Sequence, residues 1–249
     1  MQQRAKPKAP KPLRKVTVVV PAYNEEEHIG GMLASLKSWR KGHPDKRNIK
    51  LLVVNDGSTD KTAQIAEREG VEVIHSDPKD PRHNMGKADA VRVGALRARD
   101  VHKSDILVML DADLKEPEGR AIDEMIKPVA DREYQMTVAQ TGEGVSVSRS
   151  ESGNRAIYLP VLNPWLNGHP KWAPVKGYGL EEGLNKLIRL DKQYFFKSTM
   201  FSAEGPFRKV WQGKNQSAEV WWTRRHLDDR VYPANKAKEL VAQKKYKEA

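Results

Sequence analysis

The fold of this chain is decided by residues 104–114, which read Ser-Asp-Ile-Leu-Val-Met-Leu-Asp-Ala-Asp-Leu. The apolar run from Ile106 to Leu110 predicts a strand that is buried on both faces of a parallel sheet. Two carboxylates, Asp111 and Asp113, follow at once and flank Ala112. Because open α/β sheets bind their ligands at the carboxyl ends of their strands, the pattern predicts a ligand site at this point.

The pair Asp111 and Asp113 favours a metal ion. Two carboxylates this close repel each other, and a cation between them removes that cost. Mg²⁺ and Mn²⁺ prefer oxygen ligands and are commonly shared with the phosphates of a substrate. The alternative is that both residues are solvated and cap a following helix. The rest of the chain has to decide between these interpretations, because Asp-x-Asp alone is a common pattern.

Strand and helix patterns alternate along the chain. Apolar runs predict strands at 16–20, 49–54, 71–74, 136–139 and 194–196. Spaced apolar residues predict helices at about 26–40, after Thr59 or Asp60, after Ala90 to about Arg99, at 122–129 and at 184–190. This alternation predicts a nucleotide-binding α/β sheet. Residues 141–152 are rich in Ser and Gly and indicate a mobile loop.

The length and composition exclude several classes of protein. A chain of 249 residues can bury one substantial core, so one domain with extensions is expected. The absence of cysteine excludes disulfides and thiolate metal sites. No apolar leader and no apolar run of about 18 residues is found, so we expect neither a signal peptide nor a transmembrane segment. The expected location is the cytoplasm, with association to DNA or to a membrane as alternatives.

Positive charge is concentrated at the two ends of the chain. The net charge is +11. Residues 1–15 carry six Lys or Arg and no acid, and residues 236–249 carry five Lys against two Glu. The ends therefore supply nine of the eleven charges, which favours a polyanionic partner over merely solubilising tails. DNA is favoured slightly over an acidic lipid surface, because neither end has the apolar face of an interfacial helix.

Four motifs follow predicted strands in order: Pro21 to Glu25, Asp56-Gly57-Ser58, Gly86-Lys87 and Asp111-Ala112-Asp113. Over roughly residues 15–140 they resemble the GT-A-fold, family-2 nucleotide-sugar glycosyltransferases. The resemblance implies an α/β fold with a mixed, mainly parallel sheet flanked by helices and a smaller acceptor-side region. It divides the chain into a basic disordered arm (1–15), a nucleotide-sugar half (16–140), an acceptor half (141–234) and a basic tail (235–249).

Two later segments extend the resemblance. Residues 152–156, Ser-Gly-Asn-Arg-Ala, and 177–181, Gly-Tyr-Gly-Leu-Glu, are similar to acceptor-side segments of two groups of bacterial enzymes. These are the glucosyl-3-phosphoglycerate synthases and small cell-wall-type family-2 enzymes. Phage glycosyltransferases that modify DNA bases share the fold as well, so the resemblance implies a nucleotide-sugar donor and leaves the acceptor open.

The resemblance also implies a role for each motif. Asp111 and Asp113 would hold Mn²⁺ or Mg²⁺ against the diphosphate of a UDP-sugar, with Asp113 essential for catalysis. Asp56 would meet the uracil or the ribose, because a carboxylate accepts N–H or hydroxyl donors. Lys87 would approach the diphosphate or the sugar, and the alternative for Lys87 and Glu25 is an ordinary solvated surface charge. The remaining residues implied to bind the donor are Pro21, Ala22, Tyr23, Glu25, Gly86 and Ala112.

On the acceptor side, Glu181 is the candidate general base or sugar-hydroxyl ligand. Glu181 lies at the start of a predicted helix, where the helix dipole stabilises any carboxylate, so the alternative is that it has no role in catalysis. The neighbouring Glu182 is the competing candidate for the base. Arg155 would bind an acceptor phosphate bidentately or form a structural salt bridge.

His226 is the candidate histidine ligand of the metal. Related enzymes often complete the coordination with a late His, and residues 203–208, where it is expected, contain none. His226 would replace it, and the alternatives are water at the site and a lone surface histidine.

These observations predict a metal-dependent glycosyltransferase whose acceptor is a hydroxymethylated base in DNA. A small phosphorylated metabolite or a polyprenyl phosphate is the alternative acceptor. A second alternative is a non-catalytic nucleic-acid-binding protein on a glycosyltransferase scaffold. The Asp111 and Asp113 pair argues against that alternative, because a scaffold has no need to keep two repelling carboxylates.

Overall fold

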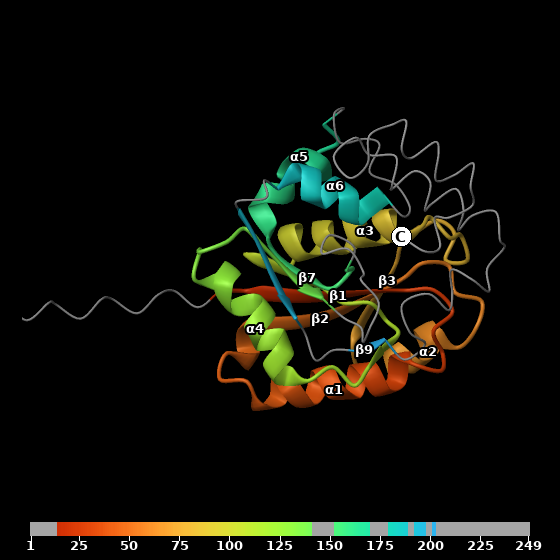
Figure 1. Cartoon of the computed structure of the whole chain (residues 1–249). Helices are drawn as coiled ribbons and strands as arrows, with labels where there is room; N and C mark the ends of the chain where they lie inside the picture. Colours follow the sequence, from red (N-terminus) through yellow and green to blue (C-terminus); the bar gives the residue numbers. More distant parts are fainter. Residues whose placement is uncertain (1–13, 141–151, 170–178, 189–191, 198–200, 203–249) are drawn as a thin grey trace, which may run out of the picture. The chain divides into compact units, whose positions relative to one another are not determined.

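The computed structural model describes residues 14–140, 152–169, 179–188, 192–197 and 201–202. Within these ranges, helices cover both faces of a seven-stranded sheet with the order β3-β2-β1-β4-β7-β6-β8 (Figure 1). The strands are β1 (Val16–Ala22), β2 (Ile49–Asn55), β3 (Glu72–His75), β4 (Ile106–Met109), β6 (Met136–Gln140), β7 (Arg155–Tyr158) and β8 (Gln193–Lys197).

Strand direction confirms the mixed, mainly parallel sheet. Strands β1, β2, β3 and β4 are parallel to one another, and β6 is parallel to β8. Strand β7 runs antiparallel to both β4 and β6. The chain moves outward from β1 to β3 and then returns to β4 on the other side of β1. The order therefore reverses between β1 and β4, which is where ligands bind in open α/β sheets.

Alternating side chains of the central strands build two cores. In β1, Val18 and Val20 face one core, and Val19 faces the other. The first core is closed by α1 (Ile29–Gly42), α2 (Thr62–Arg68) and α4 (Gly119–Ala130). The second core is closed by α3 (Lys87–Asp100), α5 (Asn163–Leu166) and α6 (Leu180–Leu187). The described ranges also contain two short 3-10 helices, η1 (Lys46–Asn48) and η2 (Leu159–Leu162).

A second sheet, which the sequence did not predict, pairs β5 (Leu114–Lys115) with β9 (Phe201–Ser202). The two strands are antiparallel, and Leu114 lies opposite Ser202. Because Leu114 follows Asp113 directly, this pairing brings residues 201–202 beside the Asp111 and Asp113 motif.

Several helix and segment boundaries in the structure differ from the predicted ones. Helix α1 begins at Ile29 and not at 26, because the N–H groups of His28 and Ile29 both donate to the carbonyl of Glu25 and a turn precedes the helix. The helix predicted at 184–190 is α6, which begins at Leu180. Lys15, assigned to the basic arm, is attached to the sheet: its N–H donates to Asp105 Oδ2 at 3.0 Å.

Other predictions concern residues outside the described ranges. These are most of the basic arm, the predicted loop up to Glu151 and the C-terminal tail. In the part of the chain that the structure describes, no helix has the length and apolar character needed to span a membrane.

Candidate active site

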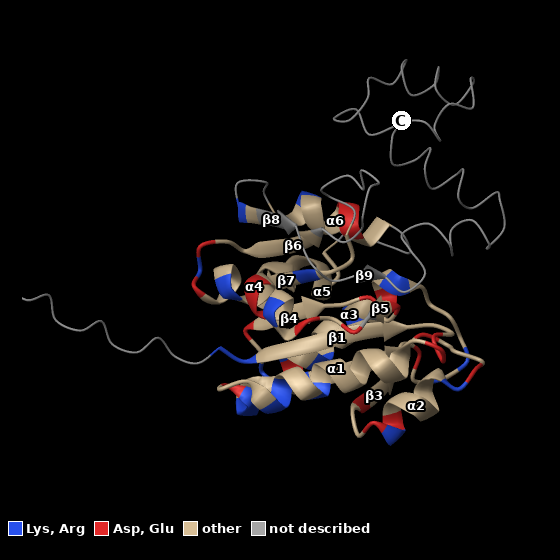
Figure 2. Ribbon diagram, turned by 60° about the horizontal axis from the view of Figure 1, so that its bottom comes forward, with Lys and Arg blue, Asp and Glu red and all other residues tan. Residues whose placement is uncertain are grey.

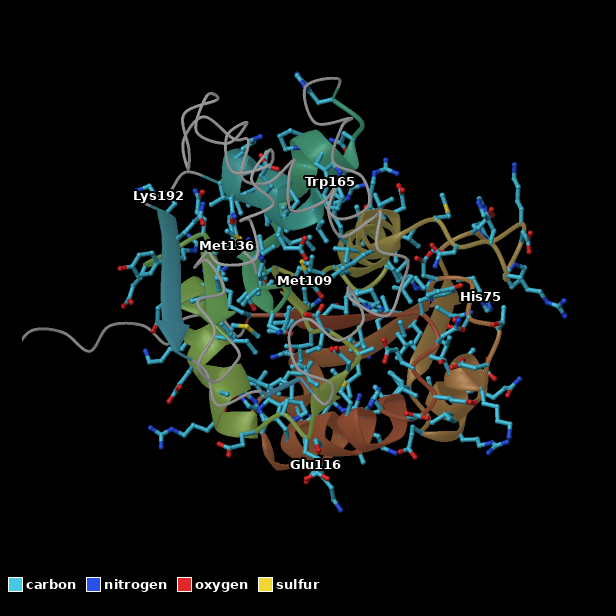
Figure 3. All side chains as sticks on the ribbon, turned by 45° about the vertical axis from the view of Figure 1, so that its right-hand side comes forward. His75, Met109, Glu116, Met136, Trp165 and Lys192 are labelled. Carbon is cyan, nitrogen blue, oxygen red and sulfur yellow. The ribbon has the colours of Figure 1, made fainter. Side chains whose placement is uncertain are left out.

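The topology brings the sequence motifs to one edge of the sheet. The segments after β1, β2 and β4 share the carboxyl edge because these strands are parallel. Strand β7 is antiparallel, so its first residue, Arg155, lies opposite Met109 at the end of β4. Met109 and His75, the last residues of β4 and β3, are labelled in Figure 3. Helix α3 starts at this edge as well, with Lys87.

Lys87 joins the two acidic motifs. Its Nζ lies 2.7 Å from Asp111 Oδ1 and 2.9 Å from Glu181 Oε1. Burial would lower the pKa of the Lys87 ammonium, but the charges of Asp111 and Glu181 outweigh it and hold the pKa above its ordinary value. Glu181 is buried, with 7% of its surface exposed. The site thus holds one cation between two carboxylates that are far apart in sequence.

The structure distinguishes Glu181 from Glu182. Glu181 points at Lys87, whereas Glu182 Oε1 lies 2.5 Å from the Nζ of Lys186 one turn along α6. Of the two acids proposed as the base, Glu181 is the one in contact with the other candidate site residues.

Two residues at the start of β7 hold Asp111 in place, and sequence reasoning assigned them only to the acceptor side. The Oδ1 of Asn154 accepts a hydrogen bond from the Asp111 N–H at 2.9 Å. A Cβ atom on Gly153 would lie 2.5 Å from Asp111 Oδ1 and 2.5 Å from Lys87 Nζ. Only a glycine leaves room for this ion pair. The signal in the sequence was the Gly-Asn dipeptide at the start of a strand.

Replacing Gly153 with alanine is expected to destabilise the protein by about 1–3 kcal/mol, because the added methyl group overpacks the Asp111 and Lys87 pair. The measurement is the free energy of unfolding in urea. Gly31→Ala is the matched control, since nothing lies within 4 Å of that site in α1 and alanine favours a helix. Equal effects of the two substitutions would contradict the close packing at Gly153.

Asp56 organises the loop that leads to Lys87. Its Oδ1 accepts hydrogen bonds from Ser76 Oγ at 2.6 Å and from the Met85 N–H at 2.9 Å. Its Oδ2 accepts one from the Gly86 N–H at 2.9 Å. The residue is only 4% exposed. Asp56 therefore positions the start of α3, and its contact with uracil or ribose stays a prediction.

The loops after β1 and β2 are hydrogen-bonded to each other. Asn24, which has a positive φ of 54°, accepts a hydrogen bond from the Thr59 N–H through its Oδ1 at 2.8 Å. The N–H of Glu26 donates to Asp60 Oδ2 at 3.1 Å. The N–H of Glu25 donates to Thr62 Oγ1 at 2.7 Å. These contacts fix the loop that the sequence assigned to the nucleoside.

The residues assigned to the nucleoside pocket differ in exposure. Pro21 and Ala22 are the last residues of β1, and the carbonyl of Ala22 accepts a hydrogen bond from the Asp56 N–H at 2.8 Å. Glu25 is buried, and its Oε2 lies 3.2 Å from His28 Nδ1. Tyr23 is 46% exposed, which makes its ring the large apolar surface offered by this loop. We therefore expect Tyr23 to be the residue of this loop that meets a base.

Arg155 lies inside the protein, with no exposed surface. Its Nε donates to the carbonyl of Ser152 at 2.8 Å, and its Nη1 donates to Asn185 Oδ1 at 2.7 Å. These contacts give Arg155 a structural position, but both acceptors are neutral oxygens, so the predicted salt bridge stays a prediction. The bidentate contact with an acceptor phosphate stays a prediction without support from this geometry.

Asp113 and Ala112 occupy the turn between β4 and β5, where Ala112 is buried and Asp113 is partly exposed. Within the described ranges, no group of three or more His, Asp or Glu side chains is arranged to hold a metal ion. His226, predicted as a third ligand, lies outside the described residues.

Acidification is expected to weaken the fold through Glu181. Burial would raise the pKa of this carboxyl, but the charges of Lys87 and Arg155 outweigh burial and hold the pKa below its ordinary value of 4.5. A carboxyl whose pKa is lowered by folding stabilises the protein above its unfolded pKa, and the contribution is lost as the pH falls through the folded value. Lys87 has the opposite sign: its raised pKa stabilises the protein until the pH rises above its unfolded value of 10.5.

The free energy of unfolding in urea, measured at a series of pH values below 4.5, tests this expectation. It should fall more steeply with decreasing pH in the wild-type protein than in Glu181→Gln. Glu182→Gln is the control, because its carboxylate pairs with Lys186 near the surface. Parallel curves for the wild-type protein and Glu181→Gln would show that the ion pair does not contribute.

Known proteins resemble this chain over large parts of its length. A family model described as Glycosyl transferase family 2 matches residues 17–174. An uncharacterized protein of Methanocaldococcus jannaschii is 35% identical over 154 residues, which cover 61% of this chain and 55% of that protein. A dolichyl-phosphate beta-glucosyltransferase of Trichomonas vaginalis is 37% identical over 110 residues, which cover 41% of this chain and 31% of that protein. The chain thus spans about half the length, or less, of these curated relatives.

A solved structure agrees with the fold. It is glucosyl-3-phosphoglycerate synthase from Mycobacterium tuberculosis in complex with Mn²⁺, UDP-glucose and phosphoglyceric acid. It matches with a TM-score of 0.63 at 22% identity and covers 85% of this chain and 79% of that chain. The likeness confirms the predicted GT-A fold. Because the family model matches more than half of the sequence, this chain belongs to glycosyl transferase family 2.

Proposed function

We propose that this chain transfers a sugar from a UDP-sugar to an acceptor, with the help of a divalent metal ion. The observation that carries the proposal is the meeting of Asp111, Lys87 and Glu181 at the carboxyl edge of the sheet. Such an edge binds nucleotides in open α/β folds. The match to an enzyme that was solved with Mn²⁺ and UDP-glucose supports the same conclusion.

The carboxylate oxygens of Asp111 and Asp113 are the kind of ligand that a divalent ion prefers. The Asp111 carboxylate is paired with the Lys87 ammonium at 2.7 Å, so a divalent ion would replace Lys87 at this oxygen. Asp111 and Asp113 would hold Mn²⁺ or Mg²⁺ through oxygen atoms, with His226 as the proposed third ligand. When bound, such an ion neutralises the negative charge that develops on the diphosphate as the sugar leaves.

The chain's own residues would bind and orient the two substrates. Tyr23 would cover the base, next to Pro21, Ala22 and Glu25. Asp56 would keep the N–H groups of Met85 and Gly86 in place, so that α3 starts at a fixed point. Lys87, when no longer paired with Asp111, would donate its protons to the diphosphate oxygens.

Glu181 would act on the acceptor. In the transfer, a bond forms between the acceptor oxygen and the anomeric carbon, and the bond from that carbon to the diphosphate breaks. An acceptor hydroxyl, such as that of phosphoglycerate, loses a proton, and Glu181 is the proposed group that receives it. A polyprenyl phosphate would attack through an ionised phosphate oxygen and would need no base. A carboxylate that stays ionised at neutral pH is in the correct state to do so.

For the acceptor, a phosphorylated molecule has the best support. The relatives named above include a dolichyl-phosphate glucosyltransferase and a synthase solved with phosphoglyceric acid. Neither name concerns DNA, so the hydroxymethylated base that the sequence favoured is the second candidate. A polyprenyl phosphate and phosphoglycerate are therefore the first acceptors to test.

The test has two stages. First, UDP and Mn²⁺ together should raise the melting temperature, because a ligand at 100 times its Kd stabilises a protein by about 2.7 kcal/mol. Second, mass spectrometry should detect a glycosylated product in a panel of UDP-sugars with a polyprenyl phosphate, phosphoglycerate or hydroxymethylated duplex DNA. Equal stabilisation by UDP in EDTA would overturn the proposal. A product that forms only with donors that are not UDP-sugars would overturn it as well.

A further inference from the structure

Five basic side chains cluster where α1 ends and β2 begins. They are Arg40 and Lys41 in α1, Lys46 and Arg47 in η1, and Lys50 in β2, and together they are called the basic edge. Four of them are exposed and Arg40 is partly exposed. In the described part of the chain, none of the five forms an ion pair.

Nearby carboxylates do not neutralise the basic edge. Asp45 is the one acid between residues 40 and 50. Asp123 accepts a hydrogen bond from Trp39 Nε1 at 2.9 Å and lies 3.5 Å from His43 Nε2. Some basic residues on other elements are paired, such as Arg97 with Glu72 and Lys127 with Asp131. The basic edge is therefore a local excess of positive charge on the folded body, distinct from the charges of the two chain ends.

The basic edge lies across the sheet from the candidate active site. Lys50 pairs in register with Thr17 near the start of β1, whereas Asp111 follows the carboxyl end of the neighbouring β4. The seven residues of β1 separate the two edges by about 20 Å. Figure 2 shows Lys and Arg gathered at the end of α1 that lies near the start of β1.

We propose that the basic edge binds the phosphate backbone of a nucleic acid, at a surface separate from the sugar-transfer site. Lys and Arg side chains supply most phosphate contacts in such complexes, and the contacts are independent of base sequence. The two Arg guanidinium groups can also bind phosphate bidentately.

An acidic membrane fits this surface less well. Membrane-surface binding combines basic residues with apolar side chains that enter the lipid. The large apolar side chains exposed in the described part of the chain are Tyr23, Met85 and Val101, and none of them belongs to residues 40–50. Because the candidate active site lies at the other edge, a nucleic acid held here would be a docking partner and not the acceptor. The inference therefore needs neither a metal ion nor a nucleotide sugar.

The test measures fluorescence anisotropy of a short labelled DNA duplex with the full chain over a range of salt concentrations. The plot of log K against log salt has a negative slope, and each lost phosphate contact reduces the magnitude of that slope by about 1. The triple variant Lys46→Gln/Arg47→Gln/Lys50→Gln should therefore reduce it by about 3. Lys46→Gln and Arg47→Gln alone should each lower it by about 1. Lys61→Gln/Lys79→Gln/Arg82→Gln is the matched control, because it removes the same charge from exposed side chains in the loops after β2 and β3.

Three results would overturn the inference. The full chain fails to bind duplex at low salt, the two triple variants bind equally well, or the chain binds phosphatidylserine vesicles through these residues and does not bind duplex. Sugar transfer, measured separately, should be the same in Lys46→Gln/Arg47→Gln/Lys50→Gln as in the wild-type protein. Failure of the proposed sugar transfer would leave the duplex result unaffected, so the two proposals are judged independently.

Discussion

Replacing Asp113 with alanine is expected to abolish sugar transfer and leave the fold intact. The side chain is partly exposed in the turn between β4 and β5, outside both cores. Its removal should therefore cost little stability. Loss of one group that stabilises developing charge in a transition state typically costs about 10²–10³-fold in kcat. We expect at least this loss, because Asp113 is the second of two carboxylates proposed to hold the ion.

The measurement is kcat with a UDP-sugar and the acceptor found in the panel, together with the melting temperature. Asp100→Ala is the control: Asp100 ends α3 at the opposite edge of the sheet and pairs with Arg99. Asp113→Ala should also lose the stabilisation that UDP and Mn²⁺ give to the wild-type protein. Full activity of Asp113→Ala, or full activity of the wild-type protein in EDTA, would refute the assignment.

The motif positions could be predicted because each is a local consequence of a strand. An apolar run that stops at Pro21, Asp56 or Asp111 marks a strand end, and parallel strands share one carboxyl edge. The sequence therefore placed three motifs at one site before any contact was known. The helix that follows was predicted from its spaced apolar residues only after Ala90, whereas α3 begins at Lys87, directly after Gly86 with its positive φ of 94° that other residues rarely adopt.

The partners of these motifs could not be predicted, since they depend on strand direction and distant contacts. Gly153 and Asn154 reach Asp111 because β7 runs antiparallel to β4, and a short apolar run does not reveal its direction. Lys87 and Glu181 are 94 residues apart, and no local spacing relates them. Burial of Arg155 was unforeseen for the same reason, because charged side chains are seldom buried without partners and its partner Asn185 is on α6.

Glu181→Gln should lower kcat far more than Glu182→Gln. A general base typically contributes about 10²–10⁴-fold, and glutamine keeps the size of the side chain but cannot take a proton. Glu182 pairs with Lys186 along α6, and such an i,i+4 pair contributes only about 0.3–0.5 kcal/mol to stability. The contrast between the two variants therefore isolates the acid that contacts Lys87 from its neighbour on the same turn.

A second comparison separates the chemical role of Glu181 from its structural role. If Glu181 takes the proton, the slow kcat of Glu181→Gln should rise as the pH is raised, because hydroxide can remove the acceptor proton in place of the carboxylate. If Glu181 only balances the charge of Lys87, Glu181→Gln and Lys87→Met should both lower the melting temperature, and the kcat of Glu181→Gln relative to the wild-type protein should not rise with pH. Equal, small effects of Glu181→Gln and Glu182→Gln on kcat would instead mean that Glu181 is a helix-start charge that steadies Lys87 and takes no part in the transfer.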